Sequence, residues 1–280
     1  MKFIKATLSI ACMTLSATTF ASTADIKASN NQIGIHYIST NVDYKETGNG
    51  IFGTPTGTLN TETGSVPGKA LSISTMWGPE NGYFEAQYSR NNGNTNYTGA
   101  LIGGGPFGSV MSTSSATITD YSLRFGKGFA VDDPSTAAYD VLMLTPYVEL
   151  GHHIWDRGVN LGETYTHSYL GIGALGQLSP VNSKLVITLN ALIGQTFGSN
   201  IVINGPFGFS GTLGNSTLYK AGLSFDYAFT KHFHGNFGSE YASFAYGMSG
   251  VHSIGGGFVA WEPDSTTTYT TFKVGLGYAF

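Results

Sequence analysis

Residues 266–280 read TTTYTTFKVGLGYAF, and from position 272 onward every second side chain is large and apolar or aromatic. The apolar set comprises Phe272, Val274, Leu276, Tyr278 and Phe280. The residues between them are small, except for Lys273. Successive side chains of a strand point to opposite faces. The alternation therefore predicts a strand with one apolar face and one small or polar face.

The first 21 residues have the features of a secretory signal peptide. Lys2 and Lys5 give a basic start, residues 6–15 are mostly apolar, and small residues at Thr19 and Ala21 fit signal peptidase cleavage. The apolar run is too short for a membrane-spanning helix. We expect residues 1–21 to be a signal peptide and residues 22–280 to form a single domain.

The composition indicates an exported β protein. Cys12 is the only cysteine, so the chain after Ala21 contains no disulfide. No stretch after Ala21 approaches eighteen apolar residues, and only 11% of the residues are charged. The formal net charge is −4, and removal of Lys2 and Lys5 makes it −6. Nucleic acid is therefore not expected as a partner.

Ten segments of the chain have strand-like patterns. They are residues 32–44, 69–77, 83–91, 116–129, 140–155, 163–178, 184–198, 216–230, 232–249 and 266–280. The connections after the first, third, seventh and ninth segments are long, and those after the second, fourth, sixth and eighth are shorter. Membrane barrels have short turns at one end and longer loops at the other. We predict an all-β fold, a closed antiparallel transmembrane up-and-down β-barrel of about ten strands, with eight or twelve as alternatives.

The last segment resembles the C-terminal strand of bacterial outer-membrane β-barrels, which typically ends on Phe. The whole pattern resembles small barrels of the opacity-protein or OmpA-barrel kind. This resemblance implies that residues 22–280 are an outer-membrane β-barrel domain in contact with outer-membrane lipid. It also implies that the barrel assembly machinery recognises the terminal set from Phe272 to Phe280. The function that it implies is structural or surface-interacting and adhesin-like, with a host or cell-surface partner bound through the extracellular loops.

Side chains opposite the apolar set are expected to line the lumen. The expected ionic network comprises Glu85, Asp120, Arg124, Glu149, Lys220, Asp226, Glu240 and Lys273. Acids and bases are mixed, and burial of either sign alone is costly, so we expect them to pair. A barrel of about ten strands is only slightly wider than those that side chains fill. We therefore predict a largely plugged polar lumen.

A polar cluster is expected at the outer rim of the hairpin around residues 156–162. It comprises His153, Asp156, Glu163 and His167. A histidine beside a carboxylate can act as a general base, so a rim hydrolase of omptin-like type is one alternative. No omptin sequence motif matches this chain residue by residue. We interpret the cluster as polar residues that close the top of the lumen, and we expect that the protein is not an enzyme.

The loops offer a second kind of site. Gly105-Pro106-Phe107-Gly108 recurs as Gly205-Pro206-Phe207-Gly208, and residues 50–53 contain a similar Phe52. Aromatic residues on loop tips can form a partner surface. A narrow channel for small or apolar solutes is the other alternative.

No cofactor or metal is expected. Residues 171–176 read GIGALG, which matches the dinucleotide-binding pattern of glycines, but they lie within a strand and a Ser-Pro turn follows. Gly171 and Gly173 are instead expected to make room for facing aromatic residues such as Tyr147.

Overall fold

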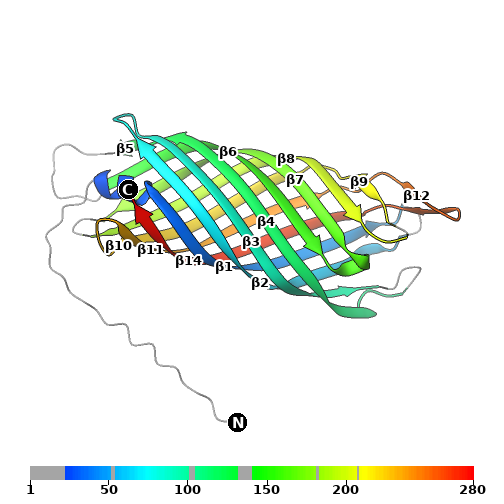
Figure 1. Ribbon diagram of the computed structural model, residues 1–280. Helices are drawn as coiled ribbons and strands as arrows, with labels where there is room; N and C mark the ends of the chain where they lie inside the picture. The colour runs from blue at the N-terminus through cyan, green and yellow to red at the C-terminus, as the bar shows by residue number, and fades with distance from the viewer. Residues whose placement is uncertain (1–22, 52–53, 101–104, 132–140, 181–182, 207) are drawn as a thin grey trace, which may run out of the picture.

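Ten long antiparallel strands form the wall of a barrel in the computed structural model, which describes residues 23–51, 54–100, 105–131, 141–180, 183–206 and 208–280 (Figure 1). The expected signal peptide, residues 1–21, lies outside the described residues. The long strands are β1 (Gln32–Asn49), β2 (Thr56–Trp77), β3 (Gly82–Gly99), β4 (Val110–Lys127), β6 (Val141–Arg157), β7 (Glu163–Ser179), β8 (Leu185–Ile203), β10 (Thr217–Ala228), β11 (Phe233–Tyr246) and β14 (Asp264–Ala279).

Short elements lie at the two ends of the barrel. They are helix α1 (Thr23–Ser29), strands β5 (Phe129–Val131), β9 (Ser210–Thr212), β12 (His252–Gly255) and β13 (Phe258–Ala260), and a 3-10 helix (Val159–Leu161). Helix α1 and the C-terminus lie at one end, here called the terminal end (Figure 1). The other end, here called the loop end, has the β3–β4, β8–β10 and β11–β14 connections, residues 100–109, 204–216 and 247–263. No helix in the described part of the chain is long and apolar enough to cross a bilayer.

The last strand closes the barrel, as its sequence pattern predicts. Strand β14 pairs with β1 from Gln32 opposite Ala279 to Thr47 opposite Asp264. Its other edge pairs with β11, and β10 pairs with β8. Every long strand thus has two neighbours, and the prediction of a closed antiparallel barrel of about ten strands is confirmed.

An apolar band covers the outer face of the barrel next to the terminal end. In β14 the exposed side chains are Phe272, Val274, Leu276 and Tyr278, and Phe280 follows them. In β1 they are Ile33, Ile35 and Tyr37. Such a band on a closed barrel is what hydrocarbon requires, since lipid leaves no partner for an unpaired backbone group.

The strands continue well past this band towards the loop end. After Tyr37, the exposed or half-buried outward residues of β1 are Ser39, Asn41, Asp43 and Lys45. Strand β1 has 18 residues, whereas a bilayer needs about 9–11 in a tilted strand. The barrel wall therefore stands in water beyond the lipid. We call this part the extension.

The extension differs from what the sequence pattern predicts. Residues 45–68 are expected to be mostly loop, yet β1 reaches Asn49 and β2 begins at Thr56. Likewise β3 continues to Gly99 and β4 begins at Val110. The reason is that outward side chains in water need not be apolar, so the alternation disappears while the backbone pairing continues.

Inward glycines make room for inward aromatic rings. Tyr147 and Gly173 lie opposite each other on β6 and β7, and a Cβ on Gly173 would lie 2.5 Å from the Tyr147 hydroxyl. The Tyr147 hydroxyl donates a hydrogen bond to Asn190 of β8. Gly151 makes room for the Tyr169 ring in the same way as Gly173 does for Tyr147.

We therefore predict that Gly173→Val displaces the Tyr147 ring and lowers the free energy of unfolding by about 1–3 kcal/mol, the usual cost of overpacking. Gly176→Val is the matched control on the same strand, because a Cβ there meets nothing within 4 Å. Urea unfolding of both variants in detergent micelles checks this. Equal stability of the two variants would contradict the packing of Tyr147 on Gly173.

Candidate functional site

The lumen contains four successive groups of side chains between the terminal end and the loop end. In this order they are a helix plug, an ionic layer, a histidine cluster and a loop-end cap. The strand register creates them, because residues directly opposite on neighbouring strands point into the lumen at the same level.

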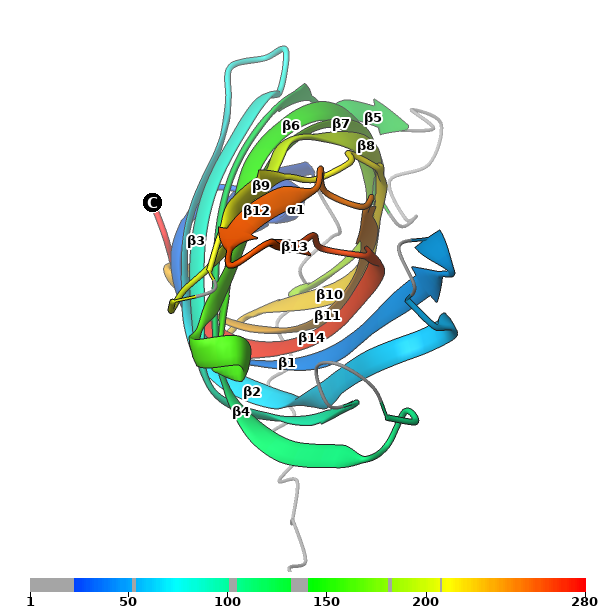
Figure 2. The same ribbon diagram turned by 90° about the vertical axis from the view of Figure 1, so that its right-hand side faces the viewer.

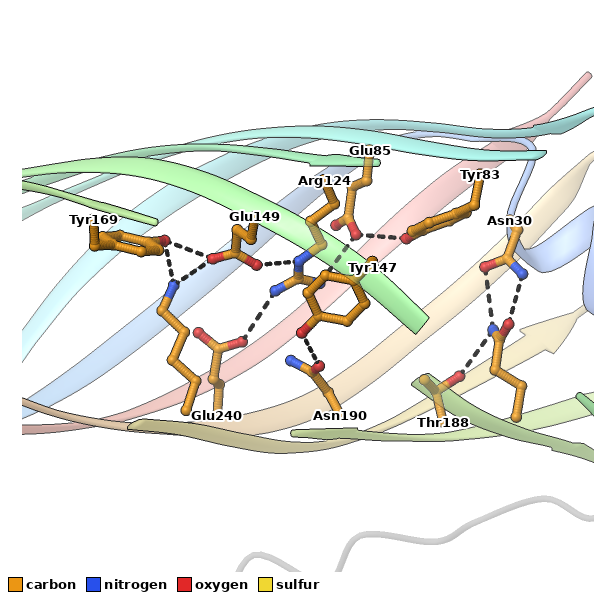
Figure 3. Close-up of polar contacts among 12 residues, drawn as sticks. Asn30, Tyr83, Glu85, Arg124, Tyr147, Glu149, Tyr169, Thr188, Asn190 and Glu240 are labelled. Carbon is orange, nitrogen blue, oxygen red and sulfur yellow. Dashed lines mark hydrogen bonds and ion pairs between the residues drawn. The ribbon is translucent and has the colours of Figure 1, made fainter. Parts of the chain in front are cut away.

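The helix plug lies at the terminal end. Ile26 of α1 is fully buried, and the side chains of Asn30 and Gln177 exchange two hydrogen bonds of 2.7 and 3.1 Å. Gln177 also donates to Thr188 on β8 (Figure 3). The sequence pattern did not predict this helix, although residues 23–29, TADIKAS, include helix-favouring alanine and lysine.

The ionic layer contains Glu85, Arg124, Glu149, Lys220 and Glu240 (Figure 3). Glu85, Arg124 and Glu149 lie directly opposite one another on β3, β4 and β6. The Arg124 guanidinium donates to Glu149, and to Glu85 at 3.1 Å. Lys220 of β10 donates to Glu149 at 3.0 Å and to the Tyr169 hydroxyl at 2.6 Å.

One ion pair of this layer crosses the barrel. Arg124 on β4 lies 3.9 Å from Glu240 on β11, five strands away around the wall in either direction. Cavities of about 130 Å³ and about 90 Å³ lie on the two sides of the layer, and Arg124, Glu240 and Lys273 line both. A water needs roughly 10–15 Å³ measured in this way, so each cavity has space for several waters.

The histidine cluster lies on the next level. Asp120, His153 and His167 are directly opposite one another on β4, β6 and β7. Asp120 accepts a 2.7 Å hydrogen bond from His153 Nδ1, and the rings of His153 and His167 lie 5.0 Å apart. His167 Nδ1 is 2.7 Å from the Tyr246 hydroxyl. Both histidines are buried.

The loop-end cap closes the extension. The Arg157 guanidinium lies 4.3 Å from the Tyr44 ring, 4.9 Å from the Trp155 ring and 5.5 Å from the Tyr165 ring. It also pairs with Glu62 at 2.7 Å and with Glu163 at 2.8 Å. All six side chains are buried. Cation–π contacts and charge-assisted hydrogen bonds are strong when the arginine is removed from water, as it is here.

Two further acids extend the cap without a cation of their own. Tyr44 donates to Glu46 at 3.3 Å, and Tyr165 donates to Glu262. The Tyr44 and Tyr165 hydroxyls are 3.0 Å apart, so hydrogen bonds link both acids. The cap therefore holds four glutamates, namely Glu46, Glu62, Glu163 and Glu262, around one arginine.

Burial favours the neutral form of two of these acids. Glu46 and Glu262 lie beyond the apolar band. Burial raises the pKa of Glu46 to about 7, against the opposing effect of Arg157. Burial also holds the pKa of Glu262 well above its usual range, and the neighbouring Glu46 and Glu163 raise it further.

The expected rim cluster is divided among different neighbours. His153 and His167 lie together, as expected, but with Asp120 and below the cap. Asp156 is exposed on the outer face and accepts a 2.7 Å hydrogen bond from Thr164. Glu163 belongs to the cap. The sequence pattern does not bring Arg157, Glu62 and Glu262 together, and their only signal is that each is a charged residue in or beside a weakly charged stretch.

The other residues named from the sequence have separate positions. Asp226 pairs with His234 at 2.6 Å near the terminal end, away from the ionic layer. Phe107 is 47% exposed at the loop end. Phe52 and Phe207 lie outside the described residues.

Comparison with solved structures supports the barrel fold through one neighbour. No protein-family model matches the sequence, and no curated protein matches it. The structure is similar to the outer-membrane protease OmpT of Escherichia coli, with a TM-score of 0.57 and 9% identity over 89% of this chain and 95% of that chain. It also aligns with OprG of Pseudomonas aeruginosa, with a TM-score of 0.35 and 15% identity over 90% and 98% of the chains. A third alignment is with Ail, the attachment invasion locus protein of Yersinia pestis, with a TM-score of 0.32 and 10% identity over 90% and 99% of the chains.

The fold is that of a small β-barrel of the bacterial outer membrane. Its closed wall and exposed apolar band fit hydrocarbon, and both chain ends of the barrel lie at the end where three of the four turns, residues 78–81, 180–184 and 229–232, are short. In such barrels the short turns face the periplasm and the longer loops face outward. The loop end, with the extension and its cap, is therefore extracellular.

We predict that the cap loosens as the pH rises. The raised pKa values mean that Glu46 and Glu262 keep their protons in the folded protein at a pH where the unfolded chain has released them. The free energy of unfolding therefore falls as the pH rises from about 4.5 through about 7. The expected loss between about pH 5 and pH 8 is on the order of 1–3 kcal/mol. Hydrogen exchange of peptides covering the cap, corrected for intrinsic exchange rates, measures it.

Glu46→Gln removes one of the titrating groups and keeps an oxygen to which Asn60 Nδ2 and the Tyr44 hydroxyl can donate. It should therefore flatten the pH dependence. Slower corrected exchange at pH 8 than at pH 5 would contradict the protonated state of the cap.

Proposed function

We propose that this outer-membrane barrel is a surface-interaction protein, which binds a partner through uncharged extracellular loops while its lumen stays closed. The observation that carries the proposal is the absence of charge from the extracellular connections. Residues 47–61, 91–119, 158–162, 185–219 and 247–261 contain no Lys, Arg, Asp or Glu. These stretches span all five connections at the loop end.

Exposed apolar side chains accompany this lack of charge. At the loop end they include Ile51, Phe107, Met111, Leu161, Val251, Phe258 and Val259. Phe258 is 66% exposed and Met111 and Leu161 are each 76% exposed. Exposed apolar groups gathered on one face favour contact with another surface over simple solvation.

The hairpin of β12 and β13 is the most prominent of these loops. It projects past its neighbours at the loop end, and from that end it lies over the mouth of the barrel (Figures 1 and 2). Its two strands pair with each other alone among the described residues. Gly255, Gly256 and Gly257 at its tip all have positive φ, between 63° and 90°. Phe258 and Val259 follow directly, so a tight glycine turn presents them to the outside.

The side chains that fill the lumen argue against a conduit or a hydrolase. The cap, the ionic layer and the helix plug each occupy it, with fully buried Trp155, Arg157 and Ile26 among their residues. The Asp120–His153 pair could serve as a base, yet it lies beneath the cap and away from the extracellular surface. A macromolecular substrate would have to displace the cap to reach it.

We predict that the purified barrel gives no discrete ion-conducting steps in a planar bilayer at neutral pH, because side chains fill its lumen. Removal of the first 30 residues together with Arg124→Ala and Arg157→Ala should then give conducting events. Steady conductance by the unaltered protein would instead support the channel alternative.

We also predict that Phe258→Ser combined with Val259→Ser reduces adhesion of barrel-carrying bacteria to cultured cells. Truncation of apolar interface anchors typically costs about 1–2 kcal/mol each, so the expected reduction is roughly tenfold or more. Ser253→Ala in the same hairpin is the control. Gel mobility before and after heating verifies that each variant is folded.

Salt provides a second measurement on the same cells. Binding by uncharged loops should change little between about 0.05 M and 0.5 M NaCl, whereas contacts between exposed charges are largely screened at the higher salt. Adhesion that the hairpin variant leaves unchanged, or that salt abolishes, would contradict the proposal.

A further inference from the structure

Two basic side chains lie directly opposite each other on the outer face of the barrel. Lys69 of β2 and Arg90 of β3 are register partners, and both are exposed. The Cβ atoms of such a pair lie about 4.5–5.5 Å apart, and like charges at this distance disfavour the strand pairing. An outward basic pair in this position therefore requires an explanation.

No carboxylate lies next to this pair on the outer face. Its outward neighbours on β1 to β4 are Ile35, Tyr37, Ser39, Pro67, Leu71, Tyr88, Asn92, Thr117, Thr119 and Tyr121. None of these carries a charge. Among the described residues, neither Lys69 nor Arg90 forms an ion pair or a side-chain hydrogen bond.

The pair lies at the outer boundary of the apolar band. Leu71 and Tyr88 are the last apolar or aromatic outward residues on β2 and β3 before the extension, and Lys69 and Arg90 follow directly. Tyr37 is the register partner of Lys69 on β1. The Tyr88 and Tyr121 rings lie 5.2 Å apart just below. Exposed tyrosines at this level mark the depth of the lipid headgroups.

The third basic residue on the outer face of the extension has a different setting. Lys45 lies two residues from Asp43 on the same face of β1, so an acid is close to it. The unbalanced basic charge at headgroup depth is thus confined to Lys69 and Arg90.

We propose that Lys69 and Arg90 bind a phosphate of an outer-leaflet lipid headgroup. The planar guanidinium of Arg90 can donate two parallel hydrogen bonds to phosphate oxygens, and the ammonium of Lys69 adds a compact charge beside it. The anion offsets the repulsion between the two side chains. Tyr37, Tyr88 and Tyr121 contact the same lipid beneath its phosphate. The site faces the membrane and not the lumen.

The barrel in neutral detergent tests this site when bisphosphorylated lipid A is added to the micelles. Lipid A should raise the unfolding temperature of the unaltered protein, and its dephosphorylated form should not. Lys69→Gln combined with Arg90→Gln should weaken lipid A binding roughly tenfold. Lys45→Gln is the matched control and should bind as the unaltered protein does.

Two further arms make the outcome decisive. Without lipid, the double variant should unfold at the same or a higher temperature than the unaltered protein, because the repulsion is removed. Inorganic phosphate at the same phosphate concentration should stabilise the protein far less than lipid A. Equal binding by the double variant, or equal stabilisation by free phosphate, would overturn the proposal of a lipid site.

Discussion

The requirement that every backbone polar group in hydrocarbon be paired determines the rest of this structure. Closure through β14 and β1 meets that requirement and fixes the register of all ten long strands. The same register then sets what each side of the wall presents. Inward, it aligns Glu85 with Arg124 and Glu149. Outward, it aligns Lys69 with Arg90. The charged groups of the lumen and those of the lipid boundary are therefore consequences of one hydrogen-bonding pattern.

The outer face of the barrel contacts lipid along one part of its length and water along the other, and the two parts differ accordingly. Near the terminal end, the wall is apolar outside, and Arg124 joins opposite walls through Glu240. In the extension, the wall is polar outside, and buried aromatic rings around Arg157 fill the inside. The cap lies between the loop end and the histidine cluster. In the proposed function, the partner contacts the uncharged loops and the β12–β13 hairpin.

Sequence patterns predicted the part of the fold that lipid constrains. The alternation from Phe272 to Phe280 gave the closing strand, and the opposite set gave Arg124 and its acidic partners. The extension was not predictable in this way, because a wall with water on one side tolerates Thr, Asn and Gly at outward positions. Glu46, Glu62 and Glu262 consequently lay in expected loops, and their convergence on Tyr44, Tyr165 and Arg157 depends on pairing that the extension alone provides.

If the cap closes the lumen to the outside, cysteine labelling on intact cells will show it. The chain after Ala21 has no native cysteine, so single introduced thiols report without background. Ser122 lines the 90 Å³ cavity beneath the cap, and Asn41 is exposed on the outer face of the extension. A membrane-impermeant maleimide should label Asn41→Cys rapidly and leave Ser122→Cys unlabelled. Labelling of Ser122→Cys at the rate of Asn41→Cys would contradict a closed lumen.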